Sequence, residues 1–166
     1  MLNTCFTTHN CTLLHKYAPK PNKFFIHLFN NSNITIKQSI TMLRTILLVG
    51  LGSAGGGILR YLAGRWIHTI IPTSFPIGTM VVNILGCFFI GLVYCIFSKN
   101  TTMDSNLQLL LATGFCGGFT TFSSFMHENY AMIENGNFVQ VAIYTGLSII
   151  LGLLALYFAI YLCKHI

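Results

Sequence analysis

The residues best suited to chemistry lie together between Gly114 and Glu128, in a stretch that reads GFCGGFTTFSSFMHE. This stretch combines three glycines, four hydroxyl side chains and four phenylalanines inside a hydrophobic region of the chain. A helix that only faces lipid would be built from Leu, Ile and Val, whose side chains carry no hydrogen-bonding groups. The composition therefore indicates a functional site within a membrane-spanning segment.

The first chemistry that this stretch offers is the binding of a cation. Gly117 and Gly118 are followed by Thr120 and Thr121, and these poor helix formers predict a break in the helix. A break releases backbone carbonyls, which are tolerated at membrane depth only when they are buried in protein or bound to a ligand. A desolvated cation such as sodium would suit them, and the alternative is that the glycines form a flexible packing seam.

The second chemistry is the binding of an anion. Phe122 and Phe125 are three residues apart and share one helical face, with Ser123 and Ser124 between them. Aromatic ring edges carry a positive potential and hydroxyls donate hydrogen bonds, so this face could hold an anion without a fixed positive charge. The alternative is that the two rings belong to an ordinary hydrophobic core.

Composition places these residues in a membrane protein. The mean hydropathy is +0.69 and only 7% of the residues are charged, against about 25% in a soluble domain. Four runs with almost no charge approach or exceed the ~20 residues that a helix needs to cross a bilayer: residues 45–59, 67–98, 105–127 and 135–163. We therefore expect an all-α integral membrane protein with four transmembrane helices, the third of which is broken at its Gly-Gly-x-Thr-Thr segment.

Two domains of unequal character are expected. Residues 1–41 are rich in Asn, Thr, Lys and His, and we expect a disordered basic tail, or a segment that is not translated if translation begins at Met42. Residues 42–166 would form the four-helix transmembrane domain. The net charge of +6 arises largely from flanks and tail. No basic patch interleaved with aromatic residues accompanies it, so we expect contact with membrane lipid and no nucleic acid partner.

Cysteine and histidine do not indicate a disulfide framework or a zinc site. Four of the six cysteines fall inside the expected spans, so we interpret them as small apolar fillers: Cys87, Cys95, Cys116 and Cys163. The remaining two alternate with histidines in the tail, at a spacing that fits no standard zinc pattern: Cys5, His9, Cys11 and His15.

The first and second helices must position the broken one. The first, expected at about 44–63, carries the pair Gly52 and Gly56 at the small-xxx-small spacing that lets helix backbones approach closely in lipid. Arg60 near its end is expected to reach the membrane interface, and a polar connection containing Trp66 and His68 would follow. The second helix is expected to begin near Gly78.

Polar side chains on the second, third and fourth helices share faces. Thr79 and Asn83 are four residues apart, and the Asn83 amide would either bond another helix or line a polar pathway. Glu128, where the third helix is expected to end, would be a solvated end charge or an ion-vestibule residue. The fourth helix, expected at about 138–163, carries Tyr144 and Ser148 on one face with Gly152.

Three segments of the chain closely resemble the signatures of the CrcB/Fluc family of fluoride channels. They read GGGILRY from residue 55, GTMVVNILG from residue 78 and GFCGGFTTFSSF from residue 114, and the resemblance covers about residues 42–166. It implies a passive, fluoride-selective channel that exports cytoplasmic fluoride across a microbial plasma membrane, the cell inner membrane, and lowers fluoride toxicity. It also implies an antiparallel, dual-topology homodimer with a structural sodium ion at its centre, and no enzymatic activity.

The same resemblance implies roles for individual residues. The backbone carbonyls of Gly117 and Thr120 would bind the sodium ion, and Glu128 would lie near the vestibule. The fluoride pathway would be formed by the side chains of Asn83, Phe122, Phe125 and Tyr144, with hydroxyl contacts from Thr79, Ser124 and Ser148.

The distribution of basic residues permits insertion in both orientations. One side of the membrane would hold Lys37, Arg44, Lys99 and Lys164, and the other Arg60 and Arg65. This bias is modest by the positive-inside rule. A heterodimer with a homologous subunit is the alternative to the homodimer.

Three other functions compete with a channel. A small proton-coupled multidrug exporter would need an intramembrane carboxylate, which the expected spans lack. A membrane hydrolase would use Ser123 or Ser124 as nucleophile, with His127 as the only base on that helix. A noncatalytic scaffold would tolerate changes at Asn83 and at the two phenylalanines without loss of ion flux.

Overall fold

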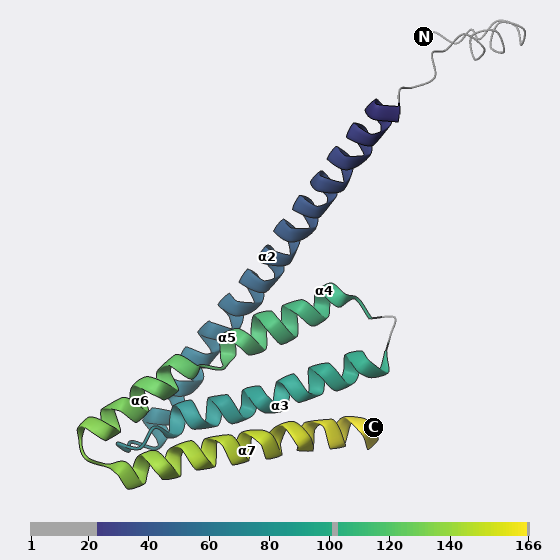
Figure 1. Cartoon of the computed structure of the whole chain (residues 1–166). Helices are drawn as coiled ribbons and strands as arrows, with labels where there is room; N and C mark the ends of the chain where they lie inside the picture. The colour runs from purple at the N-terminus through teal and green to yellow at the C-terminus, as the bar shows by residue number, and fades with distance from the viewer. Residues whose placement is uncertain (1–22, 101–102, 166) are drawn as a thin grey trace, which may run out of the picture. The chain divides into compact units, whose positions relative to one another are not determined.

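The computed structural model of this protein describes residues 23–100 and 103–165, and every element within them is helical (Figure 1). The elements are α2 (Lys23–Ile70), α3 (Ile77–Lys99), α4 (Ser105–Gln108), η1 (Leu109–Cys116), α5 (Gly117–Phe119), α6 (Phe122–Glu134) and α7 (Phe138–His165). Four stretches are long and apolar enough to cross a membrane: Thr35–Ile70, Ile77–Lys99, Ser105–Glu134 and Phe138–His165. The predicted class, an all-α protein with four transmembrane helices, is confirmed.

The chain divides into two compact units between Thr41 and Met42, and each is described by itself. In the first unit, residues 23–41 are helical. The sequence predicted a disordered tail over residues 1–41, of which residues 1–22 lie outside the described part of the chain. No Gly or Pro occurs from residue 22 to residue 49, so nothing interrupts the helix. The hydroxyls of Ser39 and Thr41 donate to carbonyls one turn back, at 3.0 and 2.9 Å, which accommodates these polar side chains on the helix. The Cys and His residues between Cys5 and His15, whose spacing fits no standard zinc pattern, lie outside the described residues.

In the second unit, α2 continues to Ile70, one and a half to two turns beyond the predicted end. Trp66 and His68 therefore belong to the helix rather than to the connection, because the first proline after the glycines is Pro72. Thr69 supports this last turn by donating its hydroxyl to the carbonyl of Arg65 at 3.0 Å.

The glycines of α2 form a packing seam against the broken helix, as the spacing predicted. A Cβ atom on Gly52 would lie 2.4 Å from the Leu110 carbonyl oxygen, and one on Gly56 would lie 2.2 Å from that of Phe115. The Ser53 hydroxyl donates to the Gly114 carbonyl across the seam, at 3.3 Å. The two backbones approach so closely that no side-chain atom fits between them at these positions.

Helices α3 and α7 lie side by side and both end at the same end of the second unit (Figure 1). Gly91 permits the close approach, because a Cβ atom there would lie 2.9 Å from the Leu156 carbonyl oxygen. Near these helix ends Cys95 and Cys163 form a disulfide, with Cα atoms 6.3 Å apart. The prediction that both are apolar fillers is wrong, since parallel neighbouring helices bring the two thiols to the same level; Cys87 and Cys116 remain free.

Candidate functional site

The third span is broken at the two threonines. Thr120 (φ −80°, ψ 153°) and Thr121 (φ −143°, ψ 114°) are extended, whereas Gly117 and Gly118 keep helical geometry within α5. The break was predicted in the correct segment, but it lies just after the glycines rather than at them. Gly118 serves the packing seam instead, because a Cβ atom there would lie 2.5 Å from the Ser53 carbonyl oxygen.

Asn83 of α3 holds the extended backbone at the break. Its Oδ1 accepts from the N–H of Thr121 at 2.8 Å, and its Nδ2 donates to the Thr121 carbonyl at 3.2 Å. The amide thus satisfies both backbone groups of one residue, as a neighbouring strand would. Of the two interpretations of Asn83, the structure shows the interhelical bond directly; the same residue also lines the groove described below.

The break changes the hydrogen bonding of two carbonyls. In a continuous helix the N–H of Thr121 would donate to the Gly117 carbonyl, and the N–H of Ser124 to that of Thr120. Here the Thr121 N–H donates to Asn83, and the Ser124 N–H donates to the Thr121 hydroxyl at 3.3 Å. The carbonyls of Gly117 and Thr120 have therefore lost their usual helical donors, which fits the chemistry of a cation ligand.

An open groove of about 450 Å³ runs past this break. It is lined by residues of α3, η1, α5, α6 and α7, among them Asn83, Gly117, Thr120, Phe122, Phe125, Thr145 and Ser148. Phe122 is 71% exposed and Phe125 only 7%, with ring centroids 6.0 Å apart. The Ser148 hydroxyl is buried and has no hydrogen-bond partner among the described residues. Ser124 lies beside the groove and accepts a bond from the Thr121 hydroxyl at 3.1 Å.

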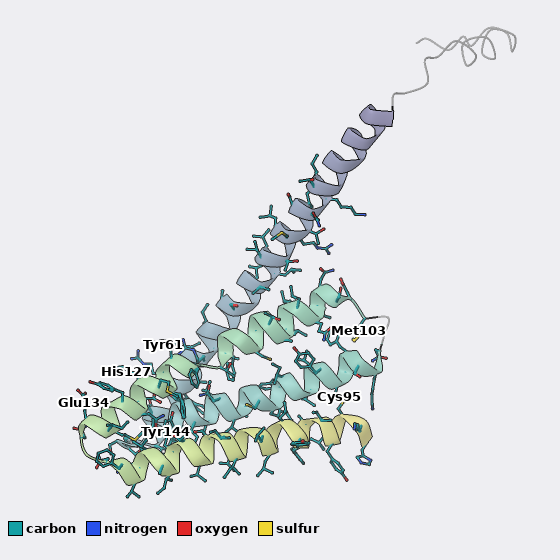
Figure 2. The ribbon with its side chains drawn as sticks, in the orientation of Figure 1. Tyr61, Cys95, Met103, His127, Glu134 and Tyr144 are labelled. Atoms are coloured by element: carbon teal, nitrogen blue, oxygen red, sulfur yellow. A yellow bond between two sulfur atoms is a disulfide. The ribbon has the colours of Figure 1, made fainter. Side chains whose placement is uncertain are left out.

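Glu128 of α6 joins this helix to α3 and α7. Its Oε1 accepts from the Thr79 hydroxyl of α3 at 2.5 Å, and its Oε2 accepts from the Tyr144 hydroxyl of α7 at 2.7 Å. Tyr144, labelled in Figure 2, is fully buried. The centroid of its ring lies 4.9 Å from that of the Phe125 ring. Helix α6 continues to Glu134, so Glu128 is neither at the end of its helix nor a solvated end charge.

A comparison of sequences identifies the relatives of this chain. The pattern that describes the family "CrcB-like protein, Camphor Resistance (CrcB)" matches residues 47–160. The chain belongs to this family. A protein of Gloeothece citriformis named "Fluoride-specific ion channel FluC" is 47% identical over 120 residues, which cover 72% of this chain and 97% of the relative.

Further relatives of this CrcB chain carry the same name. The protein of Azobacteroides pseudotrichonymphae is 44% identical over 111 residues, covering 67% of this chain and 89% of its own length. That of Leptospira interrogans is 38% identical over 122 residues, covering 74% and 96%. These proteins are named as ion channels and not as enzymes, and the matched region includes the whole of the site described above.

The site residues predicted for this CrcB chain fall into two groups. Thr79, Glu128 and Tyr144 form one hydrogen-bonded cluster, while the aromatic and hydroxyl residues Phe122, Phe125, Ser124 and Ser148 line or adjoin the groove. Ser123 and Ser124 both bond to Thr121 rather than to His127, which gives no support to a hydrolase.

Two polar residues near the site, Asn129 and Thr145, were not predicted from the sequence. Asn129 is only 6% exposed; its Nδ2 donates to the Phe125 carbonyl at 2.8 Å and its Oδ1 accepts from the Thr145 hydroxyl at 3.1 Å. Asn129 lies beyond the predicted end of the third helix, which is why it was overlooked. Its spacing of four from Phe125 was the available signal, because residues four apart share a helical face.

A second cavity, of about 420 Å³, carries positive charge. Arg60 and Arg65 line it together with Thr79 and Thr121, so it reaches both the Glu128 cluster and the break. Arg65 donates to the Tyr61 hydroxyl at 3.1 Å. Arg60, expected to reach the membrane interface, lines this cavity.

Within the described ranges, no three His, Cys, Asp or Glu side chains come together as a metal site would require. A metal ion held here would therefore depend on backbone carbonyls and hydroxyls. Hard, oxygen-only ligands of this kind suit an alkali cation rather than a transition metal.

Proposed function

We propose that this chain is a passive, fluoride-selective channel of the plasma membrane that exports cytoplasmic fluoride. Its membership of the CrcB family supports this, as do the relatives named fluoride-specific ion channels. The observation that carries the proposal is the arrangement of neutral donors and ring edges around the groove and the Glu128 cluster. A lysine there would bind a small anion too tightly to release it.

The chemistry of the ion explains the residue types. Fluoride is small, hard and strongly hydrated, so a pathway must replace its water with strong hydrogen-bond donors. The hydroxyls of Thr79 and Tyr144 donate to the carboxylate of Glu128, and a fluoride ion would have to take the place of that carboxylate to accept the same two bonds. The free hydroxyl of Ser148 offers a further donor along the groove. Several weak sites in sequence let the ion leave as readily as it enters.

The channel is proposed to work as an antiparallel homodimer in the lipid bilayer. Phe122 stays 71% exposed in the single chain although its neighbour Phe125 is buried, and the groove beside it is open. A second copy covering this face would enclose the pathway. The modest charge bias between the two membrane sides permits both orientations, and a heterodimer with a homologous subunit is the alternative that the experiment below distinguishes.

A structural sodium ion is the proposed cofactor. The carbonyls of Gly117 and Thr120, which have lost their helical donors, would hold it. When bound, it would supply a positive charge that satisfies these carbonyls and offsets part of the repulsion between nearby anions. Asn83 and the Thr121 hydroxyl keep the surrounding backbone in the shape that presents the two carbonyls.

Efflux from liposomes that contain the purified chain tests this function. We expect fast release of fluoride and little release of chloride. The variants Asn83→Ala and Phe122→Ile should lose the fluoride release. The first removes the two hydrogen bonds that hold the backbone of Thr121 at the break, and the second removes an exposed ring of the pathway. Gly55→Ala serves as control, since a Cβ atom there meets nothing within 4 Å.

The result that would overturn a homodimeric fluoride channel is a folded, wild-type protein that releases neither ion. Adding a homologous subunit to the same liposomes would then distinguish the heterodimer from a different function. Equal fluoride release by wild type and by both variants would favour the scaffold interpretation of these residues instead.

A further inference from the structure

Two consecutive hydrogen-bonded pairs connect α6 to α7. Glu128 pairs with Tyr144, and the next residue along each helix repeats the contact, because Asn129 pairs with Thr145 at 3.1 Å. The second pair adjoins the packed rings of Phe125 and Tyr144, whose centroids are 4.9 Å apart, because Asn129 bonds the Phe125 carbonyl and Thr145 follows Tyr144 in the chain. An asparagine that is only 6% exposed within a membrane span is costly unless its amide is satisfied.

The chemistry of the partners fixes the direction of both Asn129 bonds. The Phe125 carbonyl can only accept a hydrogen bond, so the amide nitrogen of Asn129 must face it. The amide oxygen then faces Thr145, and because an amide oxygen only accepts, the Thr145 hydroxyl must be the donor. The Thr145 hydroxyl therefore donates its only proton to Asn129 and cannot donate to another group.

As a result, two hydroxyls that line the same groove differ in whether they can donate a hydrogen bond to an anion. Thr145 and Ser148 are three residues apart on α7 and both line it. Among the described residues Ser148 has no acceptor, so its proton is available to an anion, whereas Thr145 can present only lone pairs, which repel one. The groove thus has one donating and one non-donating hydroxyl on the same helical face.

We propose that Asn129 is a positioning residue of the anion pathway. Through Thr145 and the Phe125 carbonyl it holds the Phe125–Tyr144 ring pair in place and removes the Thr145 proton from the groove. The inference rests on the proposed fluoride conduction and assigns to Asn129 no contact with the ion. It makes Asn129 and Thr145 one functional unit.

The test measures fluoride and chloride efflux from liposomes for Asn129→Leu, Thr145→Val and the double variant. Each single variant should release fluoride about tenfold more slowly, as expected when one buried hydrogen bond of the pathway is lost. The double variant should lie within about twofold of the singles, because both changes remove the same bond. Thr145→Ser keeps the donor and should restore the fluoride rate and the discrimination against chloride.

Asn135→Leu is the matched control. Asn135 is the C-cap residue of α6, and like that of Asn129 its Nδ2 donates to a carbonyl four residues back, at 2.8 Å, but its side chain bonds no residue of α7. If loss of such an amide bond merely loosened α6, this variant would slow fluoride as much as Asn129→Leu. We expect the wild-type rate and discrimination.

Two results would overturn the proposal: wild-type rate and discrimination in Asn129→Leu, or additive losses in the double variant. If Asn129→Leu does not fold, as judged by gel filtration, the comparison of Thr145→Val with Thr145→Ser decides, and equal rates for those two overturn it. A wild-type chain that releases no fluoride would instead reject the proposed function on which the inference rests.

Discussion

The two halves of the broken helix are held in place by opposite means. Before the break, η1 and α5 press against α2 at positions where glycine leaves no room for a side chain, as at Gly56 and Gly118. After the break, α6 is attached to α3 and α7 by hydrogen bonds between side chains, as at Glu128 and Asn129. The first half requires glycines, which have no side chain, and the second half requires polar side chains that form hydrogen bonds.

This difference shows how one membrane span can be both rigid and polar. Close backbone approach gains dispersion energy where lipid offers no hydrophobic driving force, so the glycine seam fixes the first half without any polar group. The second half can then carry a carboxylate and amides, because each has a partner in a region of low dielectric. Three variants, from the largest expected effect to the smallest, test this division.

Gly56→Ala should have the largest effect, because it inserts an atom into the seam. The new Cβ would lie 2.2 Å from the Phe115 carbonyl oxygen and 2.8 Å from the Phe119 nitrogen, both backbone atoms that cannot turn away. We expect a loss of at least about 3 kcal/mol in the free energy of unfolding, measured on the detergent-solubilised protein. Gly55→Ala, one residue away and without close neighbours, should be neutral or stabilising; equal destabilisation by both would contradict the seam.

Gly86→Ala should have an intermediate effect, because it acts at the joint between the two halves. Its Cβ would lie 2.1 Å from the Thr120 methyl group, so Thr120 must shift. We expect a loss of about 2 kcal/mol in unfolding free energy and slower fluoride efflux. Gly146→Ala, with open space around its Cβ, is the control on α7. Unchanged efflux in a clearly destabilised Gly86→Ala would show that the position of Thr120 does not matter for conduction.

Tyr144→Phe should have the smallest effect on stability, because it deletes one donor and leaves the ring packing intact. One oxygen of Glu128 loses its partner, which costs about 1–2 kcal/mol of unfolding free energy. The fluoride rate should fall several-fold, since this hydroxyl belongs to the proposed pathway. If the rate and the unfolding free energy both stay at wild-type values, the Glu128–Tyr144 bond does not support α6.

Features that depend on local composition could be predicted from the sequence. The absence of charge identified the four spans, the glycine spacing identified the seam on α2, and the Gly-Gly-x-Thr-Thr segment identified the break. Each of these follows from a property of neighbouring residues on one element. The start of α3 at Ile77 was likewise predicted to within one residue, near Gly78.

Features that depend on pairing between elements could not be predicted. The ends of α2 and α6 were placed too early, because polar residues such as His68 and Glu128 were taken as signs of a helix end, whereas each helix continues until just before the next breaker, Pro72 or Gly136. The partner of Asn83 is backbone, which has no sequence signature. The Asn129–Thr145 pair required knowing that α6 extends past Glu128 and turns back onto α7.

The disulfide between Cys95 and Cys163 can form only late, when nearly the whole chain has been synthesised. The two cysteines are 68 residues apart, and the covalent ring that they close contains the whole broken helix. Cys163 lies in the last turn of α7, so the ring can close only after the fourth span has been synthesised and laid beside α3. The bridge therefore forms only in a chain whose last helix is in place, and a chain truncated before Cys163 would keep Cys95 as an unpaired thiol.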